Sequence, residues 1–195
     1  MKYRTILLFG APGSGKGTQG RVLGAVPGFY HFASGDVFRR LTPGTELGRL
    51  FLDYSSRGEL VPDEPTIQLC CEAIEAAARD GRFDAVNDTL LLDGIPRNAN
   101  QARILSKSLD VRLVLYLSCA DMEKMVLRLQ RRALKENRLD DADPAVIRNR
   151  LEVFESKSKP LLDFYGPELR CDIDATQTPL QVALAVLQAV EERLT

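Results

Sequence analysis

The sequence has no tryptophan, a single histidine and no large excess of either charge. Lys and Arg together number 26 and Asp and Glu 27, which gives a formal net charge of −1 at pH 7. A chain so close to neutral has no overall field that would attract nucleic acid or an anionic membrane surface. We therefore expect no nucleic-acid partner, and any anion has to be bound by a local group of residues.

Cysteine is also scarce, and the chain has no long apolar run. Cys70, Cys71, Cys119 and Cys171 form no C-x-x-C pair, so neither structural zinc nor a disulfide framework is expected. No apolar stretch approaches the roughly 20 residues that cross a bilayer. Residues 1–4 lead directly into a predicted strand, so we expect no leader, no membrane contact and a cytoplasmic location.

The sequence does contain short apolar runs that alternate with helical patterns. The runs cover residues 5–9, 30–33, 89–92, 111–118 and 171–173. Near-continuous apolar strands between amphipathic helices indicate a parallel sheet with helices on both faces. We expect one α/β domain with a five-stranded parallel sheet and ligands at the carboxyl ends of the strands.

Capping residues predict three helix starts. Asp143 and Thr178 each precede a proline, and Thr178 with Gln181 has the spacing of a capping box. Asp63 precedes Glu64-Pro65 and predicts the third start.

Two segments interrupt the alternation of strands and helices. Residues 34–63 contain short helical patterns, and residues from about 132 to 142 form a polar link between two helices. We interpret both as inserts over a binding site. Gly20 and Gly24 lie inside the first predicted helix, where each costs about 1 kcal/mol relative to alanine. Only close packing explains them.

The glycine-rich segment GAPGSGKGT, residues 10–18, joins the first predicted strand to the first predicted helix. Backbone N–H groups in such a turn, together with the helix N-terminus, form an anion site. Lys16 adds a positive charge where the β- and γ-phosphates of a nucleotide would lie. The next position usually carries a hydroxyl for Mg²⁺, but here it is Gly17, and the first hydroxyl belongs to Thr18.

Asp93 ends the third apolar run and is followed by a helix that carries Arg97 and Gln101. A carboxylate at the end of a buried strand, near a phosphate loop, suits Mg²⁺ and its waters. Arg97 and Gln101 are four apart and share a helix face, on which they could hold a phosphate and a base edge. We assign a structural role to His31, because no Ser or Cys constellation accompanies it.

Arginine supplies 19 of the 26 basic residues, and its planar fork suits phosphate. Arg39 follows the second predicted strand, where it could hold the phosphate of a second substrate. Arg128 and Arg132 are four apart on one predicted helix, Arg138 lies in the polar link, and Arg150 lies on the next helix. The acidic residues that follow Arg138 could hold these arginines in place.

In their order along the chain, these motifs resemble the adenylate kinase branch of the nucleoside monophosphate kinases. The resemblance rests on GAPGSGKGTQ (10–19), SGDVFR (34–39), GTELG (44–48), GELVP (58–62), LLDGIPRNANQA (91–102), NRLDD (137–141) and the arginines at 128, 132 and 150. This branch carries glycine after the lysine, so Gly17 fits the family. The resemblance implies a P-loop NTPase-type fold, with residues 1–195 as one kinase domain. It also implies a helical NMP-binding insert at about 34–63 and a short lid at about 132–142.

The family performs reversible transfer of the γ-phosphoryl group of MgATP to AMP, and the resemblance assigns residues to each part. ATP would be bound by Gly13, Ser14, Gly15, Lys16, Gly17, Thr18, Arg128, Arg132 and Gln177. AMP would be bound by Ser34, Arg39, Glu59, Leu60, Val61, Gly94, Ile95, Pro96, Arg97, Gln101, Arg138 and Arg150. Catalysis would rest on Lys16, Arg97, Arg132, Arg138 and Arg150. Asp93 would hold Mg²⁺ through water, and the protein would act on ATP, AMP and ADP as a monomer without structural zinc.

A few residues bear on the acceptor base. Ser34 keeps the hydroxyl of the Thr usual in AMP-specific members, and Gln101 is also the AMP-type residue. Asn98 instead resembles the UMP/CMP group, and Ile95 replaces the usual Phe, which predicts a smaller and less aromatic pocket. We favour AMP, with a UMP/CMP kinase as the alternative. A P-loop regulator without kinase activity is a further alternative, but it would be expected to lack the acceptor and lid arginines.

Overall fold

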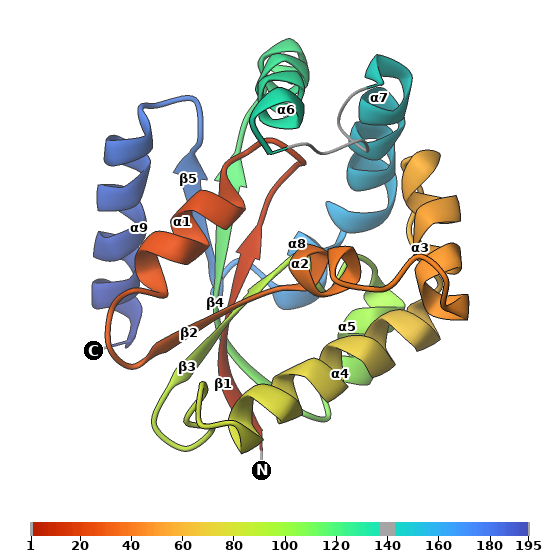
Figure 1. The fold of residues 1–195 in the computed structure, drawn as a ribbon. Helices are drawn as coiled ribbons and strands as arrows, with labels where there is room; N and C mark the ends of the chain where they lie inside the picture. The colour runs from red at the N-terminus through yellow and green to blue at the C-terminus, as the bar shows by residue number, and fades with distance from the viewer. Residues whose placement is uncertain (1, 137–142, 195) are drawn as a thin grey trace.

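The computed structural model describes residues 2–136 and 143–194, which include a five-stranded parallel sheet (Figure 1). The strands are β1 (Tyr3–Phe9), β2 (Phe29–Ala33), β3 (Thr89–Asp93), β4 (Leu109–Ser118) and β5 (Arg170–Asp174). Their order across the sheet is β2-β3-β1-β4-β5. The five predicted strands are confirmed, and each extends one or two residues beyond its apolar run.

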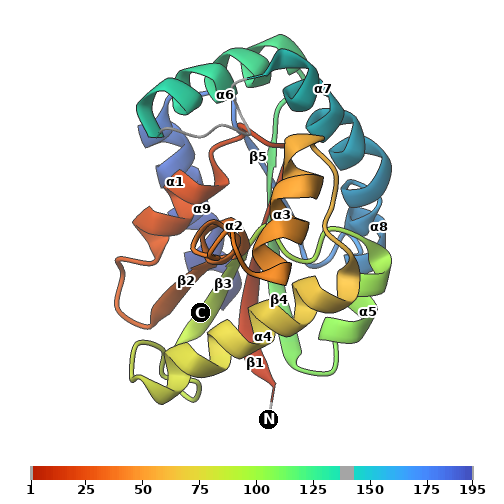
Figure 2. The same ribbon diagram turned by 45° about the vertical axis from the view of Figure 1, so that its right-hand side comes forward.

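Helices cover both faces of the sheet, as predicted. They are α1 (Lys16–Leu23), α2 (Ser34–Arg39), α3 (Glu46–Ser56), α4 (Asp63–Arg79), α5 (Ala99–Leu105), α6 (Met122–Glu136), α7 (Pro144–Val153), the π-helical turn η2 (Phe154–Ser158), α8 (Leu161–Tyr165) and α9 (Pro179–Leu194). Helices α1 and α9 lie on one face, and α4, α5 and α8 lie on the other (Figure 1). Helices α6 and α7 lie beyond the carboxyl ends of the strands (Figures 1 and 2).

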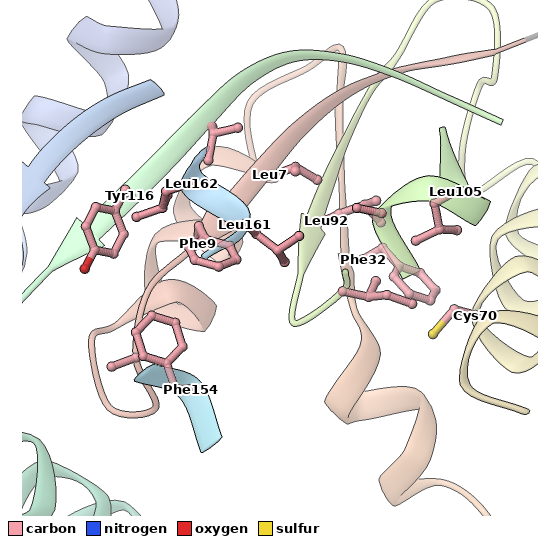
Figure 3. Close-up of a cluster of buried hydrophobic side chains, with 14 of the residues drawn as sticks. Leu7, Phe9, Phe32, Cys70, Leu92, Leu105, Tyr116, Phe154, Leu161 and Leu162 are labelled. Carbon is pink, nitrogen blue, oxygen red and sulfur yellow. The ribbon is translucent and has the colours of Figure 1, made fainter. Parts of the chain in front are cut away.

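The apolar side chains of β1 alternate between two buried clusters. Ile6 and Leu8 belong to a cluster with α1 and α9, whereas Leu7 and Phe9 belong to one with α4, α5 and α8. The ring of Phe9 packs against that of Phe154, with centroids 5.7 Å apart (Figure 3). Because helices bury both faces, the strand is apolar at successive positions rather than at every second one.

The predicted caps of α7 and α9 are confirmed. Asp143 Oδ1 accepts a hydrogen bond from a backbone N–H in the first turn of α7 at 2.8 Å. Thr178 N donates to Gln181 Oε1 at 3.1 Å, and Gln181 N donates to Thr178 Oγ1 at 3.3 Å. Helix α4 begins at Asp63, as predicted, but the N-cap position is held by Pro62. The Asp63 carboxylate accepts hydrogen bonds from the region of α5 instead.

The two predicted inserts differ in how much of each can be located. Residues 34–63 contain α2 and α3, which lie beside the carboxyl ends of β2 and β3 (Figure 2). Residues 132–136 form the end of α6. The remainder of the second predicted insert, residues 137–142 with Arg138, lies outside the described residues. The predicted division into a core, an acceptor insert and a lid therefore stays a prediction.

Candidate active site

The loop between β1 and α1 has a backbone that only glycine adopts readily. Gly10, Gly13 and Gly15 have φ values of 145°, 85° and 97°. A Cβ on Gly15 would meet no described atom within 4 Å, whereas one on Gly10 would lie 2.5 Å from the carbonyl oxygen of Leu117. The loop therefore packs closely against β4 at Gly10 and contacts no other described residue at the Cβ position of Gly15. The hydroxyl of Ser14 is buried and has no hydrogen-bond partner among the described residues, so a ligand oxygen can occupy that role.

Lys16 begins α1, and its ammonium group folds back over the loop. Nζ donates hydrogen bonds to the carbonyl oxygens of Gly10 at 2.7 Å and Ala11 at 3.1 Å. Burial lowers the pKa of Lys16 to about 8; the carboxylate of Asp93 opposes this shift and three nearby arginines add to it. A buried lysine close to several arginines favours the binding of a polyanion such as a nucleotide phosphate.

Asp93 ends β3 beside the phosphate loop, with its side chain 13% exposed. Burial opposes its ionisation, but His31, Lys16 and Arg97 outweigh burial and hold the pKa of the Asp93 carboxyl below its usual value. A Cβ on Gly17 would lie 3.5 Å from Asp93 Oδ2. An ionised carboxylate beside a residue that has no side chain suits a hydrated Mg²⁺ ion, and the role of Asp93 in holding that ion stays a prediction.

Arg97 was predicted to share a helix face with Gln101, but it lies before the helix, in the loop between β3 and α5, because Asn98 is the N-cap of α5. Hydrogen bonds hold it at several atoms. Its Nε donates to the carbonyl oxygen of Gly94 at 2.9 Å, and its own carbonyl oxygen accepts from Ser158 Oγ at 2.8 Å. Burial lowers the pKa of Arg97, and the charges of Arg150 and Arg39 lower it further. The guanidinium remains protonated, because no arginine loses its proton in the accessible pH range. The group is therefore a fixed cation whose burial an anion would compensate.

Helix α2 brings Ser34 and Arg39 to the same region. Ser34 is buried, and a Cβ on Gly94 would lie 2.6 Å from its Oγ, so the glycine permits the close approach of β3 and α2. Arg39 donates from Nη2 to Asp36 Oδ1 at 2.5 Å. A Cβ on Gly35 would lie 3.0 Å from the Arg39 guanidinium. The SGD sequence thus provides both the close packing and the orientation of the arginine.

Helix α6 and the loop after β5 form a further side of the site. Arg128 on α6 donates from Nη1 to the carbonyl oxygen of Ala175 at 2.8 Å. Gln177 follows in the same loop and lines the same cavity. The hydrogen bond therefore holds the arginine beside the loop that was predicted to contact the donor base.

A single cavity of about 450 Å³ brings together most of the predicted residues. It is lined by Gly13, Ser14, Gly15, Lys16, Gly17, Thr18, Ser34, Arg39, Glu59, Leu60, Val61, Asp93, Gly94, Pro96, Arg97, Gln101, Arg128, Arg132, Arg150 and Gln177. Ile95 is different, because it is 3% exposed and belongs to the hydrophobic core. The expectation that the Ile95 side chain narrows the acceptor pocket is corrected accordingly.

The cavity also contains residues that the sequence interpretation missed. Phe38 on α2 and Phe51 on α3 stack with ring centroids 5.2 Å apart, and both line the cavity with Thr66 and Ser158. Phe38 directly precedes Arg39, which was a signal of its position. The others lie on separate elements, and no spacing in the sequence connects them.

Two kinds of feature are absent from the part of the chain that the structure describes. Within residues 2–136 and 143–194, no group of three or more His, Cys, Asp or Glu side chains is arranged to hold a metal ion. Over the same ranges, no helix is both long enough and apolar enough to cross a bilayer. The expectation that the protein binds no structural zinc stays a prediction, since residues 137–142 are outside these ranges.

Comparison with known proteins places this site in a family. The family model described as adenylate kinase matches residues 8–169. The chain belongs to the adenylate kinase family. The adenylate kinase of Bacteroides thetaiotaomicron is 38% identical over 171 residues, which cover 84% of this chain and 85% of that protein. The adenylate kinase of Thermobifida fusca is 37% identical over 195 residues, which cover 96% and 98%.

Membership of the adenylate kinase family confirms the resemblance drawn from the motifs. The sheet order and the phosphate loop likewise confirm the predicted α/β fold of the P-loop NTPase type. The adenylate kinase of Corynebacterium urealyticum, 35% identical over 96% of this chain and 99% of its own length, supports the same assignment. These matches favour an adenylate kinase over a UMP/CMP kinase or a P-loop regulator.

Proposed function

We propose that this protein transfers the γ-phosphoryl group of MgATP to AMP and forms two molecules of ADP, in a reversible reaction. One observation carries the proposal: the same cavity is lined by the phosphate loop after β1, by Ser34 and Arg39 of α2, and by Gln101 of α5. A donor and an acceptor bound in one cavity can react directly, and positioning then supplies much of the rate enhancement. The adenylate kinases among its relatives support the choice of adenine nucleotides.

The phosphate loop forms the donor side of the proposed site. The backbone of residues 13–18 would bind the phosphate oxygens of ATP, and the hydroxyl of Ser14 would gain a partner. Lys16 would follow the transferred phosphoryl group, exchanging its hydrogen bonds to loop carbonyl oxygens for bonds to phosphate. Arg128 and the loop with Gln177 would contact the adenine of ATP.

The cationic side chains would supply most of the chemistry. Phosphoryl transfer passes through a loose transition state whose charge is spread over three equatorial oxygens. Lys16, Arg97, Arg132 and Arg150 all line the cavity and would stabilise that charge. The attacking oxygen belongs to a phosphate that is already ionised, so the reaction needs no strong general base. Mg²⁺ carried by ATP would neutralise charge on the β- and γ-phosphates, and Asp93 would hold it through water.

An activity panel tests the proposal. Purified protein with ATP and Mg²⁺ is given AMP, CMP, UMP or GMP at equal concentration, and formation of nucleoside diphosphate is measured. We expect AMP to be the preferred acceptor by about tenfold or more. Preference for CMP or UMP would favour the UMP/CMP kinase. Binding of ATP and AMP without turnover would favour the regulator.

A further inference from the structure

The carboxylate of Asp63, at the start of α4, accepts hydrogen bonds from three side-chain amides near the start of α5. Oδ1 accepts from Asn98 Nδ2 at 2.7 Å and from Gln101 Nε2 at 2.8 Å. Oδ2 accepts from Asn100 Nδ2 at 2.8 Å. The sequence interpretation regarded Asp63 only as a helix start and Asn98 only as a mark of another acceptor group. The structure instead joins both residues to Gln101.

The charge of Asp63 decides which way the amides point. Burial opposes its ionisation, but the hydrogen bonds from Asn100, Asn98 and Gln101 outweigh burial and lower the pKa of the carboxyl. An ionised carboxylate accepts hydrogen bonds and donates none. Each of the three amides must therefore turn its nitrogen, and not its oxygen, toward Asp63.

The opposite end of the Gln101 amide is held as well. Oε1 of Gln101 accepts from the backbone N–H of Arg97 at 2.8 Å, and the backbone N–H of Gln101 donates to Asn98 Oδ1 at 2.8 Å. Rotating the amide by half a turn would place Oε1 against a carboxylate and Nε2 against an N–H group. Both new contacts would be repulsive, so a single orientation is stable.

Gln101 is 1% exposed, yet it lines the cavity. After these bonds, Nε2 has one remaining hydrogen and Oε1 one remaining lone pair. Adenine presents an amino donor beside an unprotonated ring nitrogen. Hypoxanthine, of the same size and shape, presents a carbonyl acceptor beside a ring N–H. The sugar and phosphate would fix the position of the base. An amide held in one orientation then matches the arrangement of donor and acceptor on one of these two bases and opposes the arrangement on the other.

We propose that Asp63 is a positioning residue for acceptor specificity, which holds the Gln101 amide in the orientation that selects a purine with an amino group over one with a carbonyl group. This inference rests on the proposed function, in which Gln101 meets the base of the acceptor. Asp63 itself acts through Gln101 and forms no part of the transfer step.

A structural role alone for Asp63 would have different consequences. Asp63 and Glu64 both lie in the first turn of α4, where negative charge stabilises a helix. Glu64 is exposed, so Glu64→Gln removes the same charge from the same turn without disturbing the amides. It is the matched control for Asp63→Asn, whose amide can donate as well as accept. In that variant only the backbone N–H of Arg97 still opposes rotation of the Gln101 amide.

The test compares AMP with IMP as acceptors in the wild type, D63N and E64Q, with kcat and KM measured for each acceptor and KM for ATP. We expect the ratio of kcat/KM for AMP to that for IMP to fall by about tenfold or more in D63N. The change should come mainly from the KM of the acceptors, and KM for ATP should stay within about twofold. In E64Q the ratio should equal that of the wild type.

An equal loss of kcat/KM for AMP and IMP in D63N, or an unchanged ratio, would overturn the proposal. Should D63N fail to fold, Asp63→Ser provides the same comparison, since its uncharged hydroxyl both donates and accepts. The wild-type measurement distinguishes a failure of the proposed function from a failure of the proposed role of Asp63. A wild type that does not phosphorylate AMP refutes the proposed function, whereas a wild type that does so, with a variant of unchanged ratio, refutes only the role of Asp63.

Discussion

The imidazole of His31 on β2 occupies the space that a side chain on Gly20 of α1 would need. A Cβ on Gly20 would lie 2.2 Å from His31 Nε2. Gly24 was predicted inside the helix but is the C-cap of α1, and a Cβ there would lie 2.7 Å from the Cβ of His31. The two glycines thus let α1 approach β2 closely. The same approach leaves His31 Nε2 3.9 Å from Oδ2 of Asp93. The lone histidine therefore packs at the edge of the site, in agreement with its predicted structural role.

Gly20→Ala should destabilise the protein. Alanine in a free helical position would add about 1 kcal/mol of stability. Overpacking costs about 1–3 kcal/mol, and a Cβ only 2.2 Å from an atom of the largely buried His31 ring places this cost in the upper half of that range. We expect the free energy of unfolding, measured by urea denaturation, to fall by about 1–2 kcal/mol. Gly44→Ala is the control, because a Cβ there would meet no described atom within 4 Å. A more stable G20A variant would contradict the packing argument.

Lys16→Met should lower kcat for ADP formation by about a hundredfold or more while the fold is kept. Methionine has a similar length, but it cannot place a charge against the transferred phosphoryl group. The loop loses the hydrogen bonds from Nζ to the carbonyl oxygens of Gly10 and Ala11, but its conformation, which depends on Gly10, Gly13 and Gly15, should be kept. A coupled assay of ADP formation and a thermal unfolding curve are the two measurements. Near-normal turnover in a folded variant would refute the role of Lys16.

Arg97→Lys should be almost as damaging. Lysine keeps the charge but loses the planar fork, along with the Nε hydrogen bond to the Gly94 carbonyl oxygen. We expect kcat/KM for AMP to fall by about a hundredfold. Arg79→Lys on α4 is the control, since the Arg79 side chain is 69% exposed and outside the cavity lining. Comparable kinetics for the two variants would show that the fork is not needed.

The lowered pKa of Lys16 predicts a pH dependence of both activity and stability. Phosphate binding needs the protonated amine, so kcat/KM for ATP should fall as pH rises through about 8. The contribution of Lys16 to the free energy of unfolding changes with pH in the opposite direction. The folded-state pKa lies below the ordinary value of 10.5, so between these two pH values the unfolded chain binds more protons. Relative to K16M, the wild type should therefore gain stability from pH 8 to 10.5. A flat kcat/KM profile across pH 7 to 9.5 would contradict the shift.

Local patterns predicted much of the fold because they depend on neighbours in the chain. The apolar runs became strands, and Thr178 with Gln181 formed its capping box, since each rests on contacts within a few residues. The phosphate loop was predictable for the same reason. Ile95 was misjudged, because nothing in its neighbourhood distinguishes a cavity wall from the core.

The residues of the candidate site were predictable one by one, but their partners were not. Asp63 and Gln101 are 38 positions apart, and His31 meets Gly20 across the gap between a strand and a helix. The amino-acid sequence was sufficient to predict the alternation of strands and helices, the glycine loop and the family of the chain. Which side chains meet depends on the three-dimensional fold, because the strand order β2-β3-β1-β4-β5 and the packing of α4 against α5 bring distant segments together.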